Sequence, residues 1–342
     1  GCDVALLNSM IHVIIEEKLY DEQYIQANVE GFEALEKKVK DFSPESMEEI
    51  SGVPADYVRE FSRIYANSEN SIIFWGMGVS QHVHGTDNSR CLIALSLITG
   101  HVGRPGTGLH PLRGQNNVQG ASDAGLIPMV YPNYQSVEDV DIRNFFEDKW
   151  GRSLDPTKGL TVVEIMNRIV SSQMFGMYVM GENPAMSDPD QNHARLALSK
   201  LQHLVVQDIF FTETAWFADV IFPASAQPEK AGTYTNSNRQ VQIGFPVRKT
   251  PGEAKQDWKL IVDLAKRCGL NWDYKNVSAV YEEMASTMSS LNNISWQRLE
   301  KDGSVCYPVD DETSFGNEIL FSEGFPTSNG KAKIVPADLM LS

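Results

Sequence analysis

The spacing of apolar residues over the first 68 positions predicts helices. One stripe has the i, i+3, i+4, i+7 spacing of a helix face and consists of Leu7, Met10, Ile11 and Ile14. Pro54 is well placed to start a later helix, because its missing N–H costs nothing in the first turn. Val58, Phe61 and Tyr65 then give that helix an apolar face. We therefore expect residues 3–68 to be helical.

After residue 70 the pattern changes to short apolar runs separated by turn residues. Residues 71–75 read as a strand that is broken by Gly76-Met77-Gly78, and residues 86–99 read as a helix that ends at Gly100. Residues 101–136 are rich in Gly, Pro, Asn and Gln and show no clear period. We expect either a long ordered loop or a functional site without a recognisable pattern there, because loops of that length are usually functional or disordered.

Strands and helices alternate through the second half of the chain. Strands are expected at residues 177–180, 204–207 and 219–222, with a pair of strands or an irregular β segment in 233–247. Helices are expected at residues 137–150, after the Thr161–Glu164 capping box, at 190–201, briefly near Thr214, at 253–268 with Trp258, Ile261, Leu264 and Ala265 on one face, and at 278–291. The last 45 residues are expected to be loop-rich. The predicted fold class is therefore α/β, with Rossmann-like, mostly parallel sheets and flanking helices.

Length and charge limit the classes of function. The 342 residues are enough for about two domains, each with a core of its own. The formal net charge of −16 would repel a phosphate backbone, so we expect no nucleic-acid partner. The sequence has no apolar run of about 18 residues, so we expect no membrane insertion.

Cysteine usage bears on metal sites and on the cellular compartment. The four cysteines are Cys2, Cys91, Cys268 and Cys306. They form no CxxC pair, so neither a zinc site nor an iron–sulfur cluster is predicted within this stretch. His82 and His84 could share one strand face as metal ligands, but no third ligand lies near them in sequence, so we predict no metal-binding residues. Sparse, scattered cysteines fit a reducing compartment and predict a cytoplasmic location.

Polar or glycine-containing segments follow four of the predicted strands. These segments are Gly76-Met77-Gly78-Val79-Ser80-Gln81, Gly181-Glu182-Asn183-Pro184, Gln207-Asp208 and Pro223-Ala224-Ser225. In open parallel sheets, ligands bind beyond the carboxyl ends of the strands. Glycine lets a backbone approach a phosphate closely, and Asp208 can accept hydrogen bonds from ribose hydroxyls or guanine N–H groups. Together the segments predict a nucleotide-like ligand.

Each of these features also has a purely structural interpretation. Gly-Met-Gly at 76–78 is not a full GxGxxG pattern and can mark a turn. Asp208 can cap a helix, and Asn183-Pro184 can form a turn. The pattern of residues leaves these alternatives open.

Residues 112–121 are harder to explain as a solvated surface loop. They contain one arginine, Arg113, and four carboxamides, with flanking glycines and neither Lys nor Glu. Carboxamides offer both donors and acceptors, which suits a pterin edge or phosphates. The planar guanidinium of Arg113 fits a small carboxylate. We therefore favour a binding segment over a polar surface loop.

These segments resemble the molybdopterin oxidoreductases, and especially the catalytic subunits of formate dehydrogenases of the cytoplasmic, NAD-linked, multisubunit type. The likeness to formate dehydrogenases rests on residues 76–82, 99–106 and 112–123. The likeness to the wider family rests on residues 179–184, 207–210, 218–223 and 229–236, followed by Arg239 and Gln242. The segment around Arg113 is specific to formate dehydrogenases, whereas the others are shared with nitrate reductases and other relatives.

The resemblance implies the central domains of the formate dehydrogenase and DMSO reductase fold. Residues 1–115 would be part of a Rossmann-like domain, 116–226 a second, dinucleotide-binding one, 227–255 a small β segment, and 256–342 a helical return segment and loop leading to a C-terminal domain. In that family an iron–sulfur cluster and the cysteine or selenocysteine ligand of molybdenum lie upstream, and a β-barrel lies downstream. We therefore expect an internal fragment that is inactive by itself.

The resemblance also assigns a cofactor and a site. The cofactor is a bis-molybdopterin guanine dinucleotide that carries Mo or W. Its binding residues, at matching positions, are Gln81, Gln115, Asn183, Ser187, Gln207, Asp208 and Asp257. Arg113 is assigned to catalysis and would hold the formate carboxylate. Ala224 stands where some relatives carry a serine, so one contact is either lost or supplied by Ser225.

The implied function is the oxidation of formate to carbon dioxide. Electrons would leave through iron–sulfur clusters outside this segment to NAD, by way of iron–sulfur and flavin subunits. Two alternatives stay open: a relative that acts on another substrate, such as a nitrate reductase, and a binding module without catalytic activity.

Overall fold

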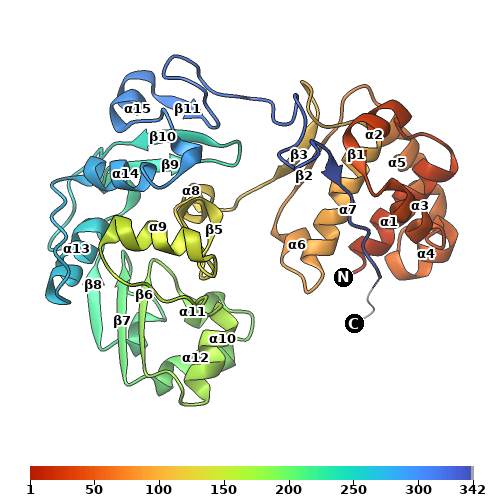
Figure 1. Ribbon diagram of the computed structural model, residues 1–342. Coiled ribbons are helices and arrows are strands. Elements are labelled where there is room, and N and C mark those ends of the chain that lie inside the picture. Colours follow the sequence, from red (N-terminus) through yellow and green to blue (C-terminus); the bar gives the residue numbers. More distant parts are fainter. Residues whose placement is uncertain (340–342) are drawn as a thin grey trace. The chain divides into compact units, whose positions relative to one another are not determined.

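The chain forms two compact units in the computed structural model, which describes residues 1–339. The first unit holds residues 1–116 and the described part of the segment that begins at residue 317, and the second holds residues 117–316 (Figure 1). The domain bounds inferred from the resemblance, at residues 115, 226 and 255, stay predictions. Among residues 1–339, none of the helices combines the length and apolar character that crossing a bilayer requires.

The first unit is mainly helical. Its helices are α1 (Asp3–Glu16), α2 (Glu22–Asn28), α3 (Phe32–Val39), α4 (Pro44–Ser51), α5 (Ala55–Asn67), α6 (Met77–Ser80) and α7 (Gly85–Ile98). Its strands are β1 (Val29–Glu30), β2 (Ile72–Trp75), β3 (Gly108–Pro111) and β12 (Ala332–Lys333). Strands β2 and β3 pair in parallel, and β12 pairs in parallel with β1.

Helix α1 supplies much of the core of this unit. Its Ile11 and Ile14 are fully buried in one cluster with Leu35 of α3 and Leu95 of α7. Burying a side chain of this size contributes about 1.5–3 kcal/mol. The stripe that starts at Leu7 therefore folds as predicted, because it is the face that α3 and α7 cover.

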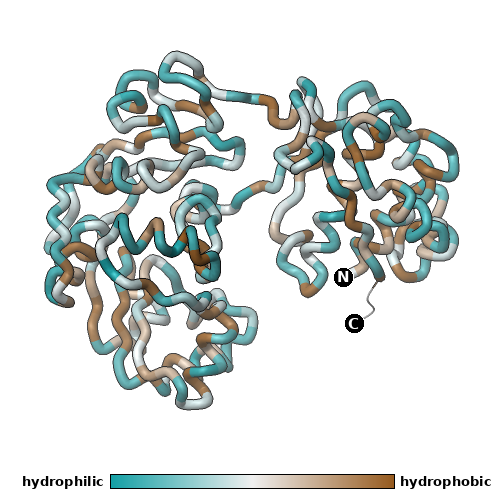
Figure 2. The backbone as a smooth tube through the Cα atoms, in the orientation of Figure 1, coloured by the Kyte–Doolittle hydropathy of each residue, from teal (hydrophilic) through white to brown (hydrophobic). Residues whose placement is uncertain are grey.

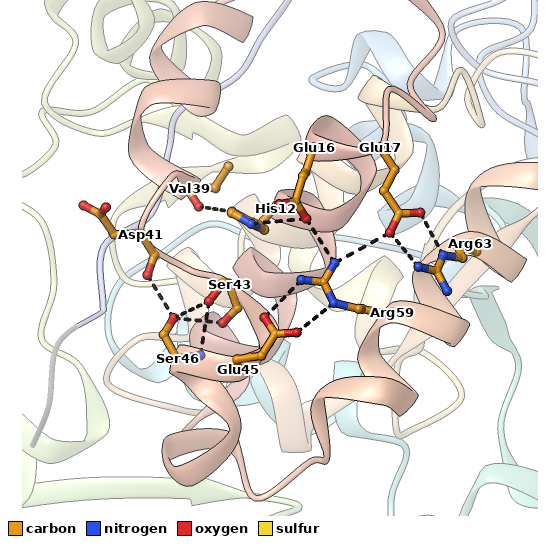
Figure 3. Close-up of polar contacts among 10 residues, drawn as sticks. All are labelled: His12, Glu16, Glu17, Val39, Asp41, Ser43, Glu45, Ser46, Arg59 and Arg63. Atoms are coloured by element: carbon orange, nitrogen blue, oxygen red, sulfur yellow. Dashed lines mark hydrogen bonds and ion pairs between the residues drawn. The ribbon is translucent and has the colours of Figure 1, made fainter.

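Ion pairs join α1, α4 and α5 at the surface of this core (Figure 3). Arg59 of α5 binds both carboxylate oxygens of Glu45 on α4, at 2.8 and 3.0 Å. The same guanidinium donates to Glu16 of α1 at 3.0 Å, and Arg63 donates to Glu17 at 2.8 and 2.7 Å. Hydrogen bonds from Arg59 lower the pKa of the Glu45 carboxyl to about 2. The network therefore fixes three helices with charge-assisted bonds.

The second unit contains three sheets among its described residues. Its strands are β4 (Val130–Tyr131), β5 (Gln135–Ser136), β6 (Gly176–Met180), β7 (His203–Asp208), β8 (Val220–Pro223), β9 (Gly232–Thr235), β10 (Gln240–Gly244) and β11 (Ser304–Cys306). Its α-helices are α8 (Val118–Asp123), α9 (Val140–Trp150), α10 (Val162–Val170), α11 (Pro184–Ser187), α12 (Gln191–Lys200), α13 (Asp257–Arg267), α14 (Val277–Ala285) and α15 (Trp296–Asp302). Its 3-10 helices are η1 (Pro132–Tyr134), η2 (Ala215–Phe217), η3 (Gln227–Glu229) and η4 (Ser289–Leu291).

A three-stranded parallel sheet with the order β6-β7-β8 positions the candidate site. Val179, Leu204 and Val206 on one of its faces are buried against Leu198 of α12. Figure 2 shows the hydrophobic colour running along β7 and β8. The sheet of β9, β10 and β11 is antiparallel and has a separate core that includes Val241.

The predicted fold class is confirmed, and so are most predicted elements. The helix at 137–150 is α9, the capping box at Thr161 and Glu164 starts α10, and the three strands of the parallel sheet lie where they were expected. The β segment in 233–247 consists of β9 and β10.

Several predictions were wrong in detail. Residues 101–136 are not one loop, because they contain β3, α8, β4 and η1. Strand β2 ends before Gly76 as predicted, but Gly76 is the N-cap of α6 and Met77 and Gly78 are its first residues, so the motif is a helix start and not a simple turn. Phe61 does not belong to the buried face of α5, since it is 57% exposed. In α13 the buried face contains Val262 and Ala265, whereas Ile261 and Leu264 are exposed.

Candidate functional site

The loops after β6, β7 and β8 start at one edge of the parallel sheet. Register places Met180 beside Gln207, and Asp208 beside Pro223. The ladder continues past the strand ends, because the Gly181 amide donates to the Gln207 carbonyl at 2.9 Å. Gly181 has a φ of 63°, a conformation that favours glycine at this turn. The sheet therefore brings three of the predicted ligand-binding segments to a common edge.

A buried glutamine joins two of these segments. Gln207 is fully buried and its Nε2 donates to Asp257 Oδ1 at 2.7 Å, which ties the end of β7 to the first residue of α13. The Tyr178 hydroxyl of β6 donates to Gln207 Oε1, and Lys230 pairs with the other oxygen of Asp257. The order along this hydrogen-bonded chain is Tyr178, Gln207, Asp257, Lys230.

The negative charge of Asp257 contributes to the raised pKa values of two tyrosines. Burial, followed by the charge of Asp257, raises the pKa of Tyr178. The same two causes, in the same order, raise the pKa of Tyr234 on β9. Both phenols therefore stay protonated near neutral pH and can donate a hydrogen bond.

The two carboxylate oxygens of Asp208 have different surroundings. Its Oδ1 accepts from the amides of Ile209 and Phe210, at 2.6 and 3.3 Å. Its Oδ2 has no hydrogen-bond partner among the described residues, and the side chain is half-buried. The helix-cap interpretation was wrong, because the next helix is η2, which begins at Ala215. One oxygen of Asp208 can therefore accept from the N–H or O–H groups of a ligand.

Asn183 and Ser187 lie together in the turn after β6, but their side chains already have partners. Asn183 Oδ1 accepts from the amide and hydroxyl of Thr214, at 3.1 and 2.7 Å, and its Nδ2 donates to Glu213 at 2.8 Å. Ser187 Oγ donates to Glu182 at 2.8 Å. Asn183 is also the N-cap residue of α11, so the turn predicted at Asn183-Pro184 is a helix start.

The other predicted site residues belong to the first unit. Gln81 follows β2, while Arg113 and Gln115 follow β3, and all three are exposed. Because β2 and β3 are parallel, with Trp75 beside Pro111, both loops leave from the carboxyl ends of neighbouring strands. The Leu112 amide donates to the Trp75 carbonyl at 2.7 Å and holds the start of the arginine segment there.

His82 and His84, considered above as metal ligands, follow Gln81 in the chain. His82 and His84 lie between α6 and α7, so the strand face proposed for them was wrong. His82 Nε2 donates to the Gly78 carbonyl at 2.7 Å. Within residues 1–339, no three His, Cys, Asp or Glu side chains form a group that could hold a metal ion.

Sequence reasoning missed two residues of the second unit and left a third open. Tyr178 lies inside a strand, where alternation gives no chemical signal, and Lys230 lies in the 229–236 motif without a distinguishing feature of its own. Ser225, considered above as a substitute contact, has a buried Oγ without a hydrogen-bond partner among the described residues. Buried hydroxyls normally have partners, so an ordered water or a ligand oxygen would have to supply the missing one here.

Comparison with known proteins places the chain in a family. The family model of the molybdopterin oxidoreductases matches residues 1–267. The F420-dependent formate dehydrogenase subunit alpha of Methanocaldococcus jannaschii is 44% identical over 340 residues, which are 99% of this chain and 50% of that protein. Formate dehydrogenase H of Escherichia coli is 38% identical over 341 residues, which are 99% of this chain and 48% of that protein.

The chain thus spans about half the length of these relatives. Among solved structures, acetylene hydratase from Pelobacter acetylenicus has the same fold, with a TM-score of 0.70, 21% identity, and coverage of 97% of this chain and 48% of that one. The family match, the fold and the polar edge of the β6-β7-β8 sheet agree, and the chain belongs to the molybdopterin oxidoreductase family.

Proposed function

We propose that this chain is the cofactor-binding portion of the catalytic subunit of a formate dehydrogenase, which oxidises formate to carbon dioxide. The observation that carries the proposal is the identity of 44% and 38%, over nearly the whole chain, to two proteins named as formate dehydrogenases. The segment around Arg113 supports it, because that segment resembles formate dehydrogenases in particular.

The proposed cofactor is a bis-molybdopterin guanine dinucleotide with Mo or W. The polar edge of the second unit fits such a group, since Asp208 Oδ2 can accept from a guanine and the orphaned Ser225 hydroxyl can donate to an oxygen. When bound, the metal and its pterins supply the redox chemistry, while the protein supplies orientation and charge.

The residues proposed to touch the cofactor divide into two kinds. Asp208 presents an oxygen with no partner among the described residues, and Gln81 and Gln115 are exposed, so these side chains can reach a ligand directly. The remaining proposed ligands are engaged with neighbours in the second unit and would exchange or share those bonds: Asn183, Ser187, Gln207 and Asp257.

Arg113 is the proposed substrate-orienting residue. Formate offers few handles besides its carboxylate, and a planar guanidinium can bind both oxygens at once, whereas a lysine offers only a point charge. Arg113 is exposed at the start of the segment that follows β3.

The proposed partners are further subunits that carry electrons away through iron–sulfur clusters outside this chain. The resemblance favours NAD as the final acceptor, with a flavin subunit and a cytoplasmic location. The relative from M. jannaschii and one from Methanococcus maripaludis, 38% identical, are both named F420-dependent. F420 is therefore the alternative acceptor.

The proposal is tested with the full-length protein of the parent gene, purified with its cofactor. We expect carbon-13 formate to give labelled carbon dioxide with an artificial electron acceptor, and reduction of either NAD or F420 in the assembled complex. Reduction of nitrate without formate oxidation would instead support the nitrate reductase alternative. Cofactor binding without turnover of either substrate would support a non-catalytic module.

A further inference from the structure

The proposed function uses only the first half of the formate dehydrogenase-like segment at 112–123. Arg113 and Gln115 lie in its exposed beginning, which has no regular secondary structure. The second half forms α8, which belongs to the second unit and contacts β9. This helix has only six residues and no apolar stripe, so its position must be fixed by specific contacts.

One of these contacts is a buried carboxylate. Asp123, the last residue of α8, is 4% exposed. It accepts a hydrogen bond from the Tyr307 hydroxyl at 2.7 Å and another from Gln119 Nε2 at 2.7 Å. A buried carboxylate is costly without such donors. The bond to Tyr307, 184 residues along the chain, therefore holds α8 against the segment after β11.

The first turn of α8 has a second anchor. Asn117 Oδ1 accepts from the backbone amide of Thr235, the last residue of β9, at 2.9 Å. At Gly120 a Cβ atom would lie 2.2 Å from Asn117 Oδ1 and 3.2 Å from Thr235 Oγ1. A side chain at residue 120 would therefore displace the Asn117 side chain, whose Oδ1 accepts from the Thr235 amide.

Tyr307 is itself held rigidly. Its amide donates to the Arg239 carbonyl at 3.1 Å, and the Arg239 guanidinium donates back to the Tyr307 carbonyl. Burial and the hydrogen bond to Asp123 raise the pKa of Tyr307 well above its usual range. The phenol therefore keeps its proton and remains a donor to Asp123.

We propose that Asp123 and Tyr307 are positioning residues for Arg113 and Gln115, an inference that rests on the proposed function. Arg113 is four residues from Asn117, so the intervening chain spans at most about 14 Å. The other side of the segment is held by the bond from Leu112 to Trp75. Fixing α8 restricts where the arginine segment can go, without any contact between Tyr307 and the substrate.

The experiment compares Tyr307→Phe with Tyr281→Phe in the full-length holoenzyme. Tyr281 is the control, because its hydroxyl donates to a residue outside α8 in the same unit, the Ile294 carbonyl at 2.7 Å. At equal metal content per protein, we expect Tyr307→Phe to lower kcat/KM for formate about tenfold, mainly through KM, and Tyr281→Phe to leave it unchanged. Hydrogen exchange in residues 112–123 should accelerate only in Tyr307→Phe.

Equal kcat/KM per metal in the two variants overturns the inference, even if exchange differs. If Tyr307→Phe does not fold, Gln119→Met removes the second donor to Asp123 and is expected to lower kcat/KM about threefold. An unchanged kcat/KM in Gln119→Met would also overturn the inference. If the unaltered enzyme does not oxidise formate, the proposed function fails instead. Hydrogen exchange in residues 112–123 then tests whether the bond between Tyr307 and Asp123 holds this segment in place.

Discussion

At the scale of residues, Asp208 combines a structural contact with a carboxylate oxygen that is proposed to bind the cofactor. Its Oδ1 is committed to the amides of Ile209 and Phe210, which fixes the carboxylate at the end of β7. Its Oδ2 has no partner among residues 1–339, so binding a guanine or ribose there breaks no existing bond. Such a preorganised acceptor forms a charge-assisted bond at little cost.

We predict that Asp208→Asn in the full-length enzyme lowers cofactor retention. Losing a charge-assisted hydrogen bond costs about 1.5–3 kcal/mol, which is a factor of about 10 to 100 in affinity. Asp263→Asn is the matched control, because Asp263 is an exposed carboxylate on α13 whose partner is Lys255 at 3.4 Å. Metal and pterin per protein are measured after dialysis; equal retention in both variants would contradict the assignment.

Gln207 illustrates how far the sequence predicts a site residue. Its place after an apolar run identified a strand end, where ligands bind, and the structure confirms that place. Its burial and its bonds to Tyr178 and Asp257 could not be predicted, because those partners lie 29 and 50 residues away and no local pattern links them. Its contact with the cofactor stays a prediction.

At the scale of elements, helix α10 was predicted from a local sequence signal, whereas helix α8, which depends on tertiary contacts, was not predicted. The capping box of α10 was predictable because Thr161 and Glu164 bond each other's backbone within one turn. Helix α8 was missed because its sequence, VQGASD, has no apolar period, and its stability comes from bonds to Thr235 and Tyr307. An element that is stabilised by residues far along the chain has no local sequence pattern from which it can be predicted.

The ion-pair network around Arg59 gives a pH-dependent prediction. The folded-state pKa of Glu45, about 2, lies below the ordinary value of 4.5, so the pair stabilises the folded state above about pH 4.5 and is lost as the pH falls toward 2. Glu45 is 57% exposed, so solvent screening reduces the contribution to about 1 kcal/mol.

Chemical unfolding of the chain at several pH values tests the predicted pH dependence of the Arg59–Glu45 ion pair. We expect Arg59→Gln to be less stable than the unaltered chain by about 1 kcal/mol at pH 7, with the difference shrinking between pH 4.5 and 2. Lys275→Gln, at an exposed ion pair with Asp273, serves as the control. A difference that stays constant down to pH 2 would show that the network does not act through the ionised Glu45.

At the scale of the whole molecule, the first unit is built from two segments that lie far apart in the sequence. Strand β12 pairs with β1 across about 300 residues, joining Val29 to Ala332. Both strands have two residues, too short for a periodic signal, so this pairing was not predictable. The second segment also places Ala332 and Ile334 in the core built around α1.

We predict that the 342-residue chain produced alone is free of metal and inactive. Burial raises the pKa of the Cys91 thiol to about 12, which keeps it protonated and unsuited to bind a metal. The relatives are about twice as long, and the family resemblance places the protein ligand of the metal outside this stretch. Elemental analysis and a formate assay test this; stoichiometric Mo or W with formate oxidation would refute it.

The central claim is that Arg113 orients formate in the assembled enzyme. The most direct measurement is formate turnover per bound metal in a full-length Arg113→Lys variant. We predict normal cofactor loading and a loss of about 2–4 kcal/mol in kcat/KM, the scale for removing one positioned donor. Poor cofactor loading with nearly normal turnover per metal would contradict the claim and assign Arg113 to a cofactor phosphate.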